Sequence, residues 1–196
     1  MGYQVMKRGF FEADVVSVAR QLLGKLLVHC TPEGTTSGII VETEAYSSKD
    51  DPACHAYKGK TKRNEVMFGP AGRAYVYFIY GNHYCFNVVT NRPGTAEAVL
   101  VRALEPVDGI ELMQARRGSQ HPVENLTSGP GKLCSALSIG KAENNLPVYA
   151  PPLFIAQGKT VERDQVGVSR RIGISAGKEK NWRYFVQENP FVSRLR

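Results

Sequence analysis

The sequence has no closely spaced cysteine pair. Its 196 residues include four cysteines, which are Cys30, Cys54, Cys85 and Cys134. Without a C-x-x-C pattern there is no sign of the paired ligands that build small structural zinc sites. The first ten residues include Lys7 and Arg8 and no apolar stretch before a cleavage site, so no signal peptide is expected. We therefore expect a cytoplasmic protein with reduced cysteines.

Long hydrophobic runs and several well-known catalytic motifs are also missing. The uncharged stretch 74–89 is too short, and too often interrupted by glycine and asparagine, to span a bilayer. The sequence has no H-E-x-x-H motif and no H-x-E joined to P-C-x-x-C, the patterns of zinc proteases and zinc-dependent deaminases. It also has no G-x-S-x-G motif. We expect no membrane association, no metal and no cofactor.

Positive charge is present in excess. Lysine and arginine number 25 against 18 aspartates and glutamates, which gives a formal net charge of +7. Such an excess favours an anionic partner, either nucleic acid, an acidic membrane face or a phosphorylated ligand. The hydrophobic share of 42% and the charged share of 22% are typical of a soluble globular domain. The length predicts a single domain over residues 1–196.

Hydrophobic periodicity and turn residues predict an α+β fold. A first helix is expected from Asp14, its N-cap, to Gly24, which ends it. The pair Gly81-Asn82 predicts a β-hairpin. Strands are expected over 25–31, 38–46, 75–80, 84–89, 98–104, 153–156, 171–174 and 184–186, and further helices over 106–117 and after a Ser128 cap. Because strands outnumber helices and one hairpin is antiparallel, the predicted class is α+β.

Glu44 is the first candidate for chemistry. It lies in the middle of a predicted strand, two residues before Tyr46, so both side chains fall on one face. A carboxylate beside an aromatic ring can act as a general base whose pKa is tuned by partial burial. Glu42 shares that face, so the pattern alone favours the alternative of a solvated strand face.

Three other segments suit nucleic-acid binding, and each has a plain structural alternative. The aromatic runs 75–80 and 84–86 can stack nucleobases or fill a hairpin core, although Tyr80 at the turn is poorly placed for a core. The basic segment 61–64 can contact phosphates or form a solvated loop. The segment 128–132 can offer helix-start amides to a phosphate or serve as an ordinary cap.

Short motifs, spread in order over nearly the whole chain, form a distinctive set. They are Val41-Glu42-Thr43-Glu44-Ala45-Tyr46, Ala53-Cys54-His55, Thr61-Lys62-Arg63-Asn64, Met67-Phe68, Tyr75-Val76-Tyr77, Tyr80-Gly81, Cys85-Phe86-Asn87, Val101-Arg102-Ala103-Leu104-Glu105-Pro106, Ser128-Gly129-Pro130-Gly131-Lys132-Leu133-Cys134, Arg171-Ile172-Gly173 and Pro190-Phe191-Val192-Ser193. This set resembles that of the alkyladenine (3-methylpurine) DNA glycosylase family. The chain has no long N-terminal extension, which is similar to the bacterial members.

The resemblance implies one compact α+β domain with a curved, mainly antiparallel sheet, a protruding β-hairpin and surrounding helices. It implies a monomeric repair enzyme that flips damaged purines out of double-stranded DNA and hydrolyses their N-glycosidic bond, with no obligate protein partner. The matched positions are Glu44 as general base; Arg102 and the backbone of Ile172 holding the attacking water; Tyr46, His55 and Tyr77 as walls of the base pocket; Asn87 against the 2-amino group of normal guanine; Tyr80 and Met67 at the wedge; and Thr61, Arg63 and Lys132 near the DNA backbone.

Departures from the family pattern leave the preferred lesion open. Ala71 stands where a proline is expected, Asn82-His83 varies the turn, and Cys54 replaces a smaller residue. No lysine lies in 42–46 or 75–87, so a monofunctional glycosylase without a lyase step is expected. The alternatives are a non-catalytic damage sensor, which the pairing of Glu44 with Arg102 disfavours, and a hydrolase of free nucleosides, which the basic charge disfavours.

Overall fold

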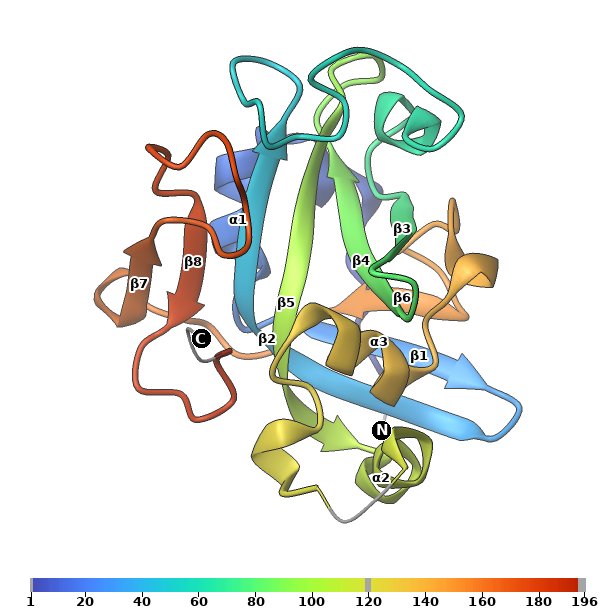
Figure 1. Ribbon diagram of the computed structural model, residues 1–196. Coiled ribbons are helices and arrows are strands. Elements are labelled where there is room, and N and C mark those ends of the chain that lie inside the picture. Colours follow the sequence, from blue (N-terminus) through green and yellow to red (C-terminus); the bar gives the residue numbers. More distant parts are fainter. Residues whose placement is uncertain (1, 119–120, 194–196) are drawn as a thin grey trace.

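The computed structural model describes residues 2–118 and 121–193 and is built on one curved sheet (Figure 1). Eight strands, all antiparallel, follow the order β3-β4-β5-β2-β1-β6, with β8 paired to β2 and β7 to β8. The strands are β1 Leu26–Thr31, β2 Gly34–Ser47, β3 Ala74–Ile79, β4 His83–Thr90, β5 Glu97–Asp108, β6 Leu153–Ala156, β7 Val166–Ser169 and β8 Arg183–Val186. The helices are α1 Val15–Leu22, α2 Ile110–Arg117 and α3 Pro130–Leu137, with 3-10 turns at Arg8–Glu12, Glu65–Phe68, Val123–Asn125, Lys141–Glu143 and Arg163–Gln165.

The long strand β2 organises the sheet. Its first half pairs with β1, its residues Glu42–Glu44 pair with β8 on the same edge, and β5 runs along its other edge. The register between β2 and β5 shifts around Glu42 and skips Val41 and Arg102. Such bulges bend and twist a strand and often lie beside active sites. The α+β class and the curved antiparallel sheet expected from the sequence are confirmed.

Local signals explain the first helix. The Asp14 side chain accepts a hydrogen bond from the Ser17 N–H at 3.0 Å, which caps α1 as expected. Gly24 follows the helix with φ +83°, and a Cβ there would lie 2.3 Å from the Lys159 carbonyl oxygen, so only glycine fits. The predicted start and end of α1 are therefore confirmed.

Helices lie on both sides of the long strands. Figure 1 shows α1 behind β2 and β5 and α3 in front of β4 and β5. The Thr43 hydroxyl donates to the Ala19 carbonyl of α1, so Glu42 and Glu44, with the opposite side-chain parity, face away from α1. None of the helices in the described ranges has the length and apolar character needed to cross a membrane.

Five expectations about the elements were wrong or incomplete. β5 continues through Pro106 to Asp108, so the helix expected from Pro106 begins only at Ile110. The N-cap of α3 is Gly129, and no side chain caps that helix, so Ser128 does not. Residues 171–174 form no strand, and the short strand β7 was not expected. The solvated face favoured for Glu42 and Glu44 is also wrong, because both side chains are fully buried.

Candidate active site

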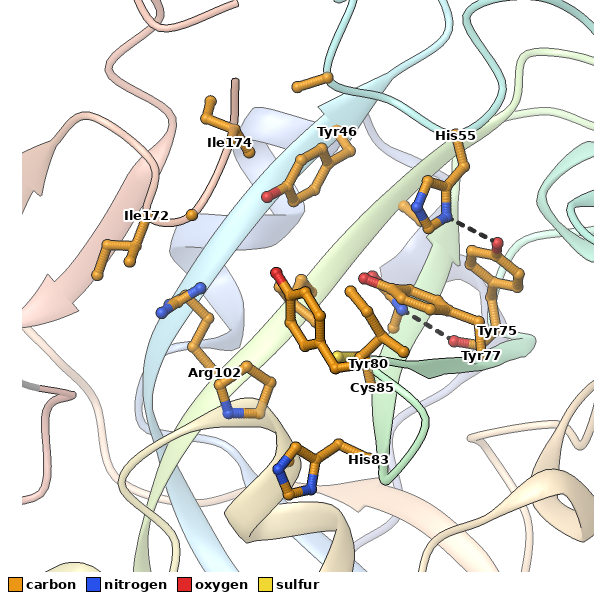
Figure 2. A pocket seen from close by; sticks show the side chains of 18 of the residues that line it. Tyr46, His55, Tyr75, Tyr77, Tyr80, His83, Cys85, Arg102, Ile172 and Ile174 are labelled. Carbon is orange, nitrogen blue, oxygen red and sulfur yellow. Dashed lines mark hydrogen bonds between the residues drawn. The ribbon is translucent and has the colours of Figure 1, made fainter. Parts of the chain in front are cut away.

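A cavity of about 490 Å³ opens between the sheet, the β3–β4 hairpin and the start of α3 (Figure 2). Its volume lies within the range of roughly 300–1,000 Å³ that is usual for small-molecule sites. The lining residues are Tyr46, Pro52, Ala53, His55, Met67, Tyr75, Tyr77, Ile79, Tyr80, His83, Cys85, Asn87, Ala98, Leu100, Arg102, Pro130, Gly131, Ile172, Gly173, Ile174 and Ser175. The cavity thus joins segments from both halves of the chain.

Glu44 lies directly behind the wall of this cavity. It is fully buried and is not itself a lining residue, but its three partners are. Glu44 Oε1 accepts from the Ile172 N–H at 2.7 Å and lies 3.3 Å from Arg102 Nη1. Glu44 Oε2 accepts from the Tyr46 hydroxyl at 2.7 Å. A carboxylate offers about four acceptor positions, so these three contacts leave room for one more donor.

Burial dominates the electrostatics of Glu44. It raises the pKa of Glu44, and the positive charge of Arg102, the Ile172 N–H and the Tyr46 hydroxyl oppose that shift without cancelling it. Burial and the charge of Glu44 also raise the pKa of Tyr46, so the phenol stays protonated. Its hydroxyl is therefore the donor of the hydrogen bond to Glu44. Glu44 is thus a desolvated carboxylate whose ionised form is favoured by Arg102 and by two hydrogen-bond donors. A pKa raised from the usual carboxyl value suits a general base.

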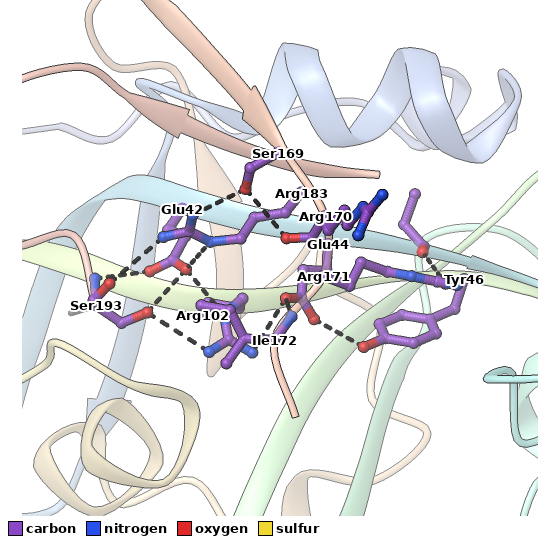
Figure 3. Close-up of polar contacts among 11 residues, drawn as sticks. Glu42, Glu44, Tyr46, Arg102, Ser169, Arg170, Arg171, Ile172, Arg183 and Ser193 are labelled. Atoms are coloured by element: carbon purple, nitrogen blue, oxygen red, sulfur yellow. Dashed lines mark hydrogen bonds and ion pairs between the residues drawn. The ribbon is translucent and has the colours of Figure 1, made fainter. Parts of the chain in front are cut away.

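A second buried carboxylate, Glu42, belongs to the same network (Figure 3). Its Oε1 accepts hydrogen bonds from Arg102 Nε at 2.9 Å and from Arg183 Nε at 2.7 Å. The Ser193 N–H donates to Glu42 Oε2, and the Ser193 hydroxyl donates to Glu42 Oε1. Burial raises the pKa of Glu42, but the two arginines and the Ser193 and Arg183 hydrogen bonds outweigh it, so the net shift is downward. Glu42 is therefore held as an anion.

An ion pair between Arg171 and Asp51 joins two walls of the cavity. The guanidinium donates to both Asp51 oxygens at 2.7 and 2.6 Å, and to the carbonyls of Ala45 and Gly177. It also lies 4.6 Å from the centre of the Tyr46 ring. This pair fixes the segment that presents the Ile172 N–H to Glu44.

Aromatic rings form the wall opposite the acidic network. The rings of His55 and Tyr77 meet edge to face, 4.5 Å apart, and His55 Nδ1 shares a 3.0 Å hydrogen bond with the Tyr75 hydroxyl. Burial, and then the charge of Arg63, lower the pKa of His55, which favours its neutral form. Buried Asn87 donates to the Tyr75 carbonyl at 3.0 Å, so its side chain is fixed where it lines the cavity.

Tyr80 and Met67 occupy different places in the site. Tyr80 is 81% exposed at the tip of the β3–β4 hairpin and has φ +55°, an unusual conformation for a tyrosine. Met67 is buried in an apolar cluster with Tyr75 and lines the cavity. The structure thus places Tyr80 at the exposed mouth and Met67 in the wall.

The three residues expected near the DNA backbone lie on two elements. Thr61 and Arg63 are exposed in the loop after β2, and Arg63 donates to the Phe78 carbonyl at 3.4 Å. Lys132 lies in the first turn of α3, where its ammonium donates to the Ser128 hydroxyl at 3.2 Å. Neither Arg63 nor Lys132 lines the cavity.

Sequence reasoning named most of the lining residues that carry polar or aromatic groups, but it missed the buried supports. Glu42 and Ser193 lie in matched motifs that assigned them no role, and Asp51 and Arg183 lie in none of the matched motifs. The matched stretch Arg171-Ile172-Gly173 was the available signal for Arg171. Within residues 2–118 and 121–193, no group of three or more His, Cys, Asp or Glu side chains is arranged to hold a metal ion.

The chain is similar to known proteins over almost its whole length. The family model described as "Methylpurine-DNA glycosylase (MPG)" matches residues 9–190. A relative from Carboxydothermus hydrogenoformans is 50% identical over 97% of this chain and 99% of its own length, and one from Methanoculleus marisnigri is 50% identical over 94% and 96%. A third, from Salinibacter ruber, is 49% identical over 94% of each chain. All three are named "Putative 3-methyladenine DNA glycosylase". The chain therefore belongs to the methylpurine-DNA glycosylase family and is a DNA glycosylase.

Proposed function

We propose that this protein excises damaged purines of the 3-methyladenine, 7-methylguanine, hypoxanthine and ethenoadenine type from double-stranded DNA. The observation that carries the proposal is the buried carboxylate of Glu44 directly behind an aromatic cavity of about 490 Å³. The names of the three relatives, which mention 3-methyladenine, support the same class of substrate. We also propose that the enzyme acts as a monomer, as the family resemblance implies.

The damaged nucleotide must leave the helix before its sugar can be attacked. Flipping costs a few kcal/mol, least for a damaged or mispaired base. Tyr80 at the hairpin tip would fill the gap in the duplex, and Tyr46, His55 and Tyr77 would stack on the base at roughly 1–3 kcal/mol for each stacked base. A neutral His55 does not repel a purine made cationic by alkylation, and the tyrosine faces attract it.

Hydrolysis then needs one general base. Glu44 takes a proton from a water molecule while the oxygen of that water forms a bond to C1′. The N-glycosidic bond breaks, and its electron pair leaves with the base. Arg102 and the Ile172 backbone hold the water and Glu44 in position. No lysine lines the cavity within the described part of the chain, so no amine is placed to attack C1′ and the product is an abasic site.

Base release from defined duplexes tests this function. Duplexes carrying hypoxanthine, ethenoadenine or 3-methyladenine are incubated with the enzyme, with its Glu44→Gln variant, and with Glu105→Gln, which changes a carboxylate on β5 outside the cavity. We expect the wild type and Glu105→Gln to release at least one of these bases. Glu44→Gln should lose release while still binding an abasic-site analogue. Release by Glu44→Gln at the wild-type rate, or release from no duplex, would contradict the proposal.

A further inference from the structure

The guanidinium of Arg102 is held through three different nitrogens (Figure 3). Its Nε donates to Glu42 Oε1 at 2.9 Å, its Nη2 donates to the Ser193 hydroxyl at 3.5 Å, and its Nη1 lies 3.3 Å from Glu44 Oε1. Two of the three contacts therefore come from Glu42 and Ser193, and only the third reaches the proposed base. Because the group is planar, fixing Nε and Nη2 also fixes the direction of Nη1.

Glu42 and Ser193 are hydrogen-bonded to each other, and Arg183 of β8 donates to both of them. The Ser193 N–H donates to Glu42 Oε2 at 2.8 Å, and its hydroxyl donates to Glu42 Oε1 at 2.8 Å. Arg183 of β8 donates through Nε to Glu42 at 2.7 Å and through Nη2 to the Ser193 carbonyl at 3.4 Å. The buried charges balance, because two carboxylates face two guanidinium groups.

We propose that Glu42 and Ser193 are positioning residues that hold Arg102 at a single-point contact with Glu44, so that the carboxyl-terminal segment completes the active site. Without this anchor, Arg102 is free to turn and face Glu44 with two nitrogens, the bidentate geometry that guanidinium and carboxylate prefer. That pairing would take the acceptor position that the attacking water needs and would make Glu44 a weaker base. The inference rests on the proposed role of Glu44.

Ser193→Ala tests the anchor most gently, because it keeps the backbone N–H that reaches Glu42. We compare it with Ser193→Thr, which keeps the hydroxyl, and with Ser169→Ala, which removes a hydroxyl that contacts Arg183 at 3.0 Å but neither Arg102 nor Glu42. The readouts are the single-turnover rate of hypoxanthine release at saturating enzyme and the affinity for a duplex with an abasic-site analogue, each per folded protein.

We expect Ser193→Ala to slow base release by about tenfold, the usual effect of losing one buried hydrogen-bonding group. Its affinity for the duplex should stay near the wild-type value, since the anchor touches neither base nor phosphate. Ser193→Thr should restore most of the rate, and Ser169→Ala should keep it. A Ser193→Ala rate equal to that of the wild type, or a loss shared equally by Ser169→Ala, overturns the proposal.

Glu42→Gln gives a second, stronger test. Here we expect a loss of about 10- to 100-fold, by analogy with the loss that follows removal of a hydrogen-bonding partner that orients a metal ligand. If this variant does not fold, Ser193→Ala still decides. A different result would contradict the proposed function itself, namely release of base by Glu44→Gln at the wild-type rate. An inactive Glu44→Gln beside fully active Ser193→Ala and Glu42→Gln would refute the positioning role alone.

Discussion

Two buried carboxylates lie two residues apart on one face of β2, and their surroundings shift their pKa values in opposite directions. Glu42 faces two arginines and Ser193, which lower its pKa against the effect of burial. Glu44 has one arginine at 3.3 Å, and burial raises its pKa. Opposite shifts of two identical side chains fit the different roles proposed for them, with Glu42 as a fixed anion and Glu44 as the group that exchanges a proton.

The pH dependence of base release should report Glu44. Because the base form is needed and burial raises its pKa, we expect the rate to fall with decreasing pH around a midpoint above the usual carboxyl range. Tyr46→Phe removes a hydrogen bond that lowers this pKa, so the midpoint should move to higher pH. The measurement is the single-turnover rate across acidic and neutral pH.

Tyr57→Phe serves as the control for this prediction. It also removes a phenol hydroxyl, but Tyr57 is 46% exposed and does not line the cavity. Its profile should match that of the wild type. A Tyr46→Phe midpoint that stays in place or moves to lower pH would show that the hydroxyl does not stabilise the ionised form of Glu44.

The sequence could indicate Glu44 but not the state of Glu42. The alternation of β2 places Glu44 and Tyr46 on one face, and this relation is local. The partners that keep Glu42 charged, Arg183 and Ser193, lie 141 and 151 residues away. No short pattern carries such long-range contacts, so a solvated strand face was the better local interpretation, although it is wrong.

At the scale of elements, the β3–β4 hairpin presents one ring at the mouth of the cavity. Tyr80 and Gly81 both have positive φ, a conformation that is uncommon for a residue as bulky as tyrosine. Asparagine tolerates this conformation, so Tyr80→Asn removes the ring and keeps the turn. If the ring acts as a wedge, Tyr80→Asn should weaken binding to a damaged duplex by about 10- to 100-fold, equivalent to roughly 1–3 kcal/mol of lost stacking.

Equilibrium binding to a duplex that contains hypoxanthine measures this effect. Tyr80→Phe keeps the ring and should bind nearly as well as the wild type. Unfolding curves of both variants show whether the hairpin change spreads into the core. Equal affinity of Tyr80→Asn and Tyr80→Phe would argue that Tyr80 is not a wedge.

Elements with local signals were predicted well, and those without them were not. The Asp14 cap and the turn of the β3–β4 hairpin depend on neighbouring residues, and both are confirmed. The stretch 171–174 is short and apolar like a strand, but the N–H of Ile172 goes to a carboxylate instead of a neighbouring strand. The helix expected from Pro106 starts later, because pairing of Pro106 with Gly38 keeps that residue in β5.

The Arg171–Asp51 ion pair links the 171–177 segment to the loop after β2, so changes at these two residues should have coupled effects on the free energy of unfolding. Arg171 and Asp51 both have fully buried side chains, so Arg171→Met leaves a buried carboxylate without its charge partner. We expect a loss of about 3–5 kcal/mol in the free energy of unfolding. Asp51→Asn added to Arg171→Met should recover part of that loss, because no unpaired charge then remains.

Urea unfolding of the two single variants, the double variant and the wild type measures this coupling as a double-mutant cycle. Arg8 and Glu12 form an exposed ion pair and provide the matched control cycle. That pair should contribute at most about 1 kcal/mol. Strictly additive effects of the Arg171 and Asp51 changes would mean that the two side chains stabilise the cavity walls independently.

At the scale of the whole molecule, the net charge of +7 favours any duplex, damaged or not. The logarithm of the affinity for undamaged DNA should fall linearly with the logarithm of salt concentration. Arg63→Gln and Lys132→Gln should each reduce the slope by about one if each contacts one phosphate. Lys159→Gln removes the same charge from an ion pair with Glu105, outside the cavity, and should leave the slope unchanged. Equal slopes for all three variants would mean that net charge alone, and not these two positions, holds the duplex.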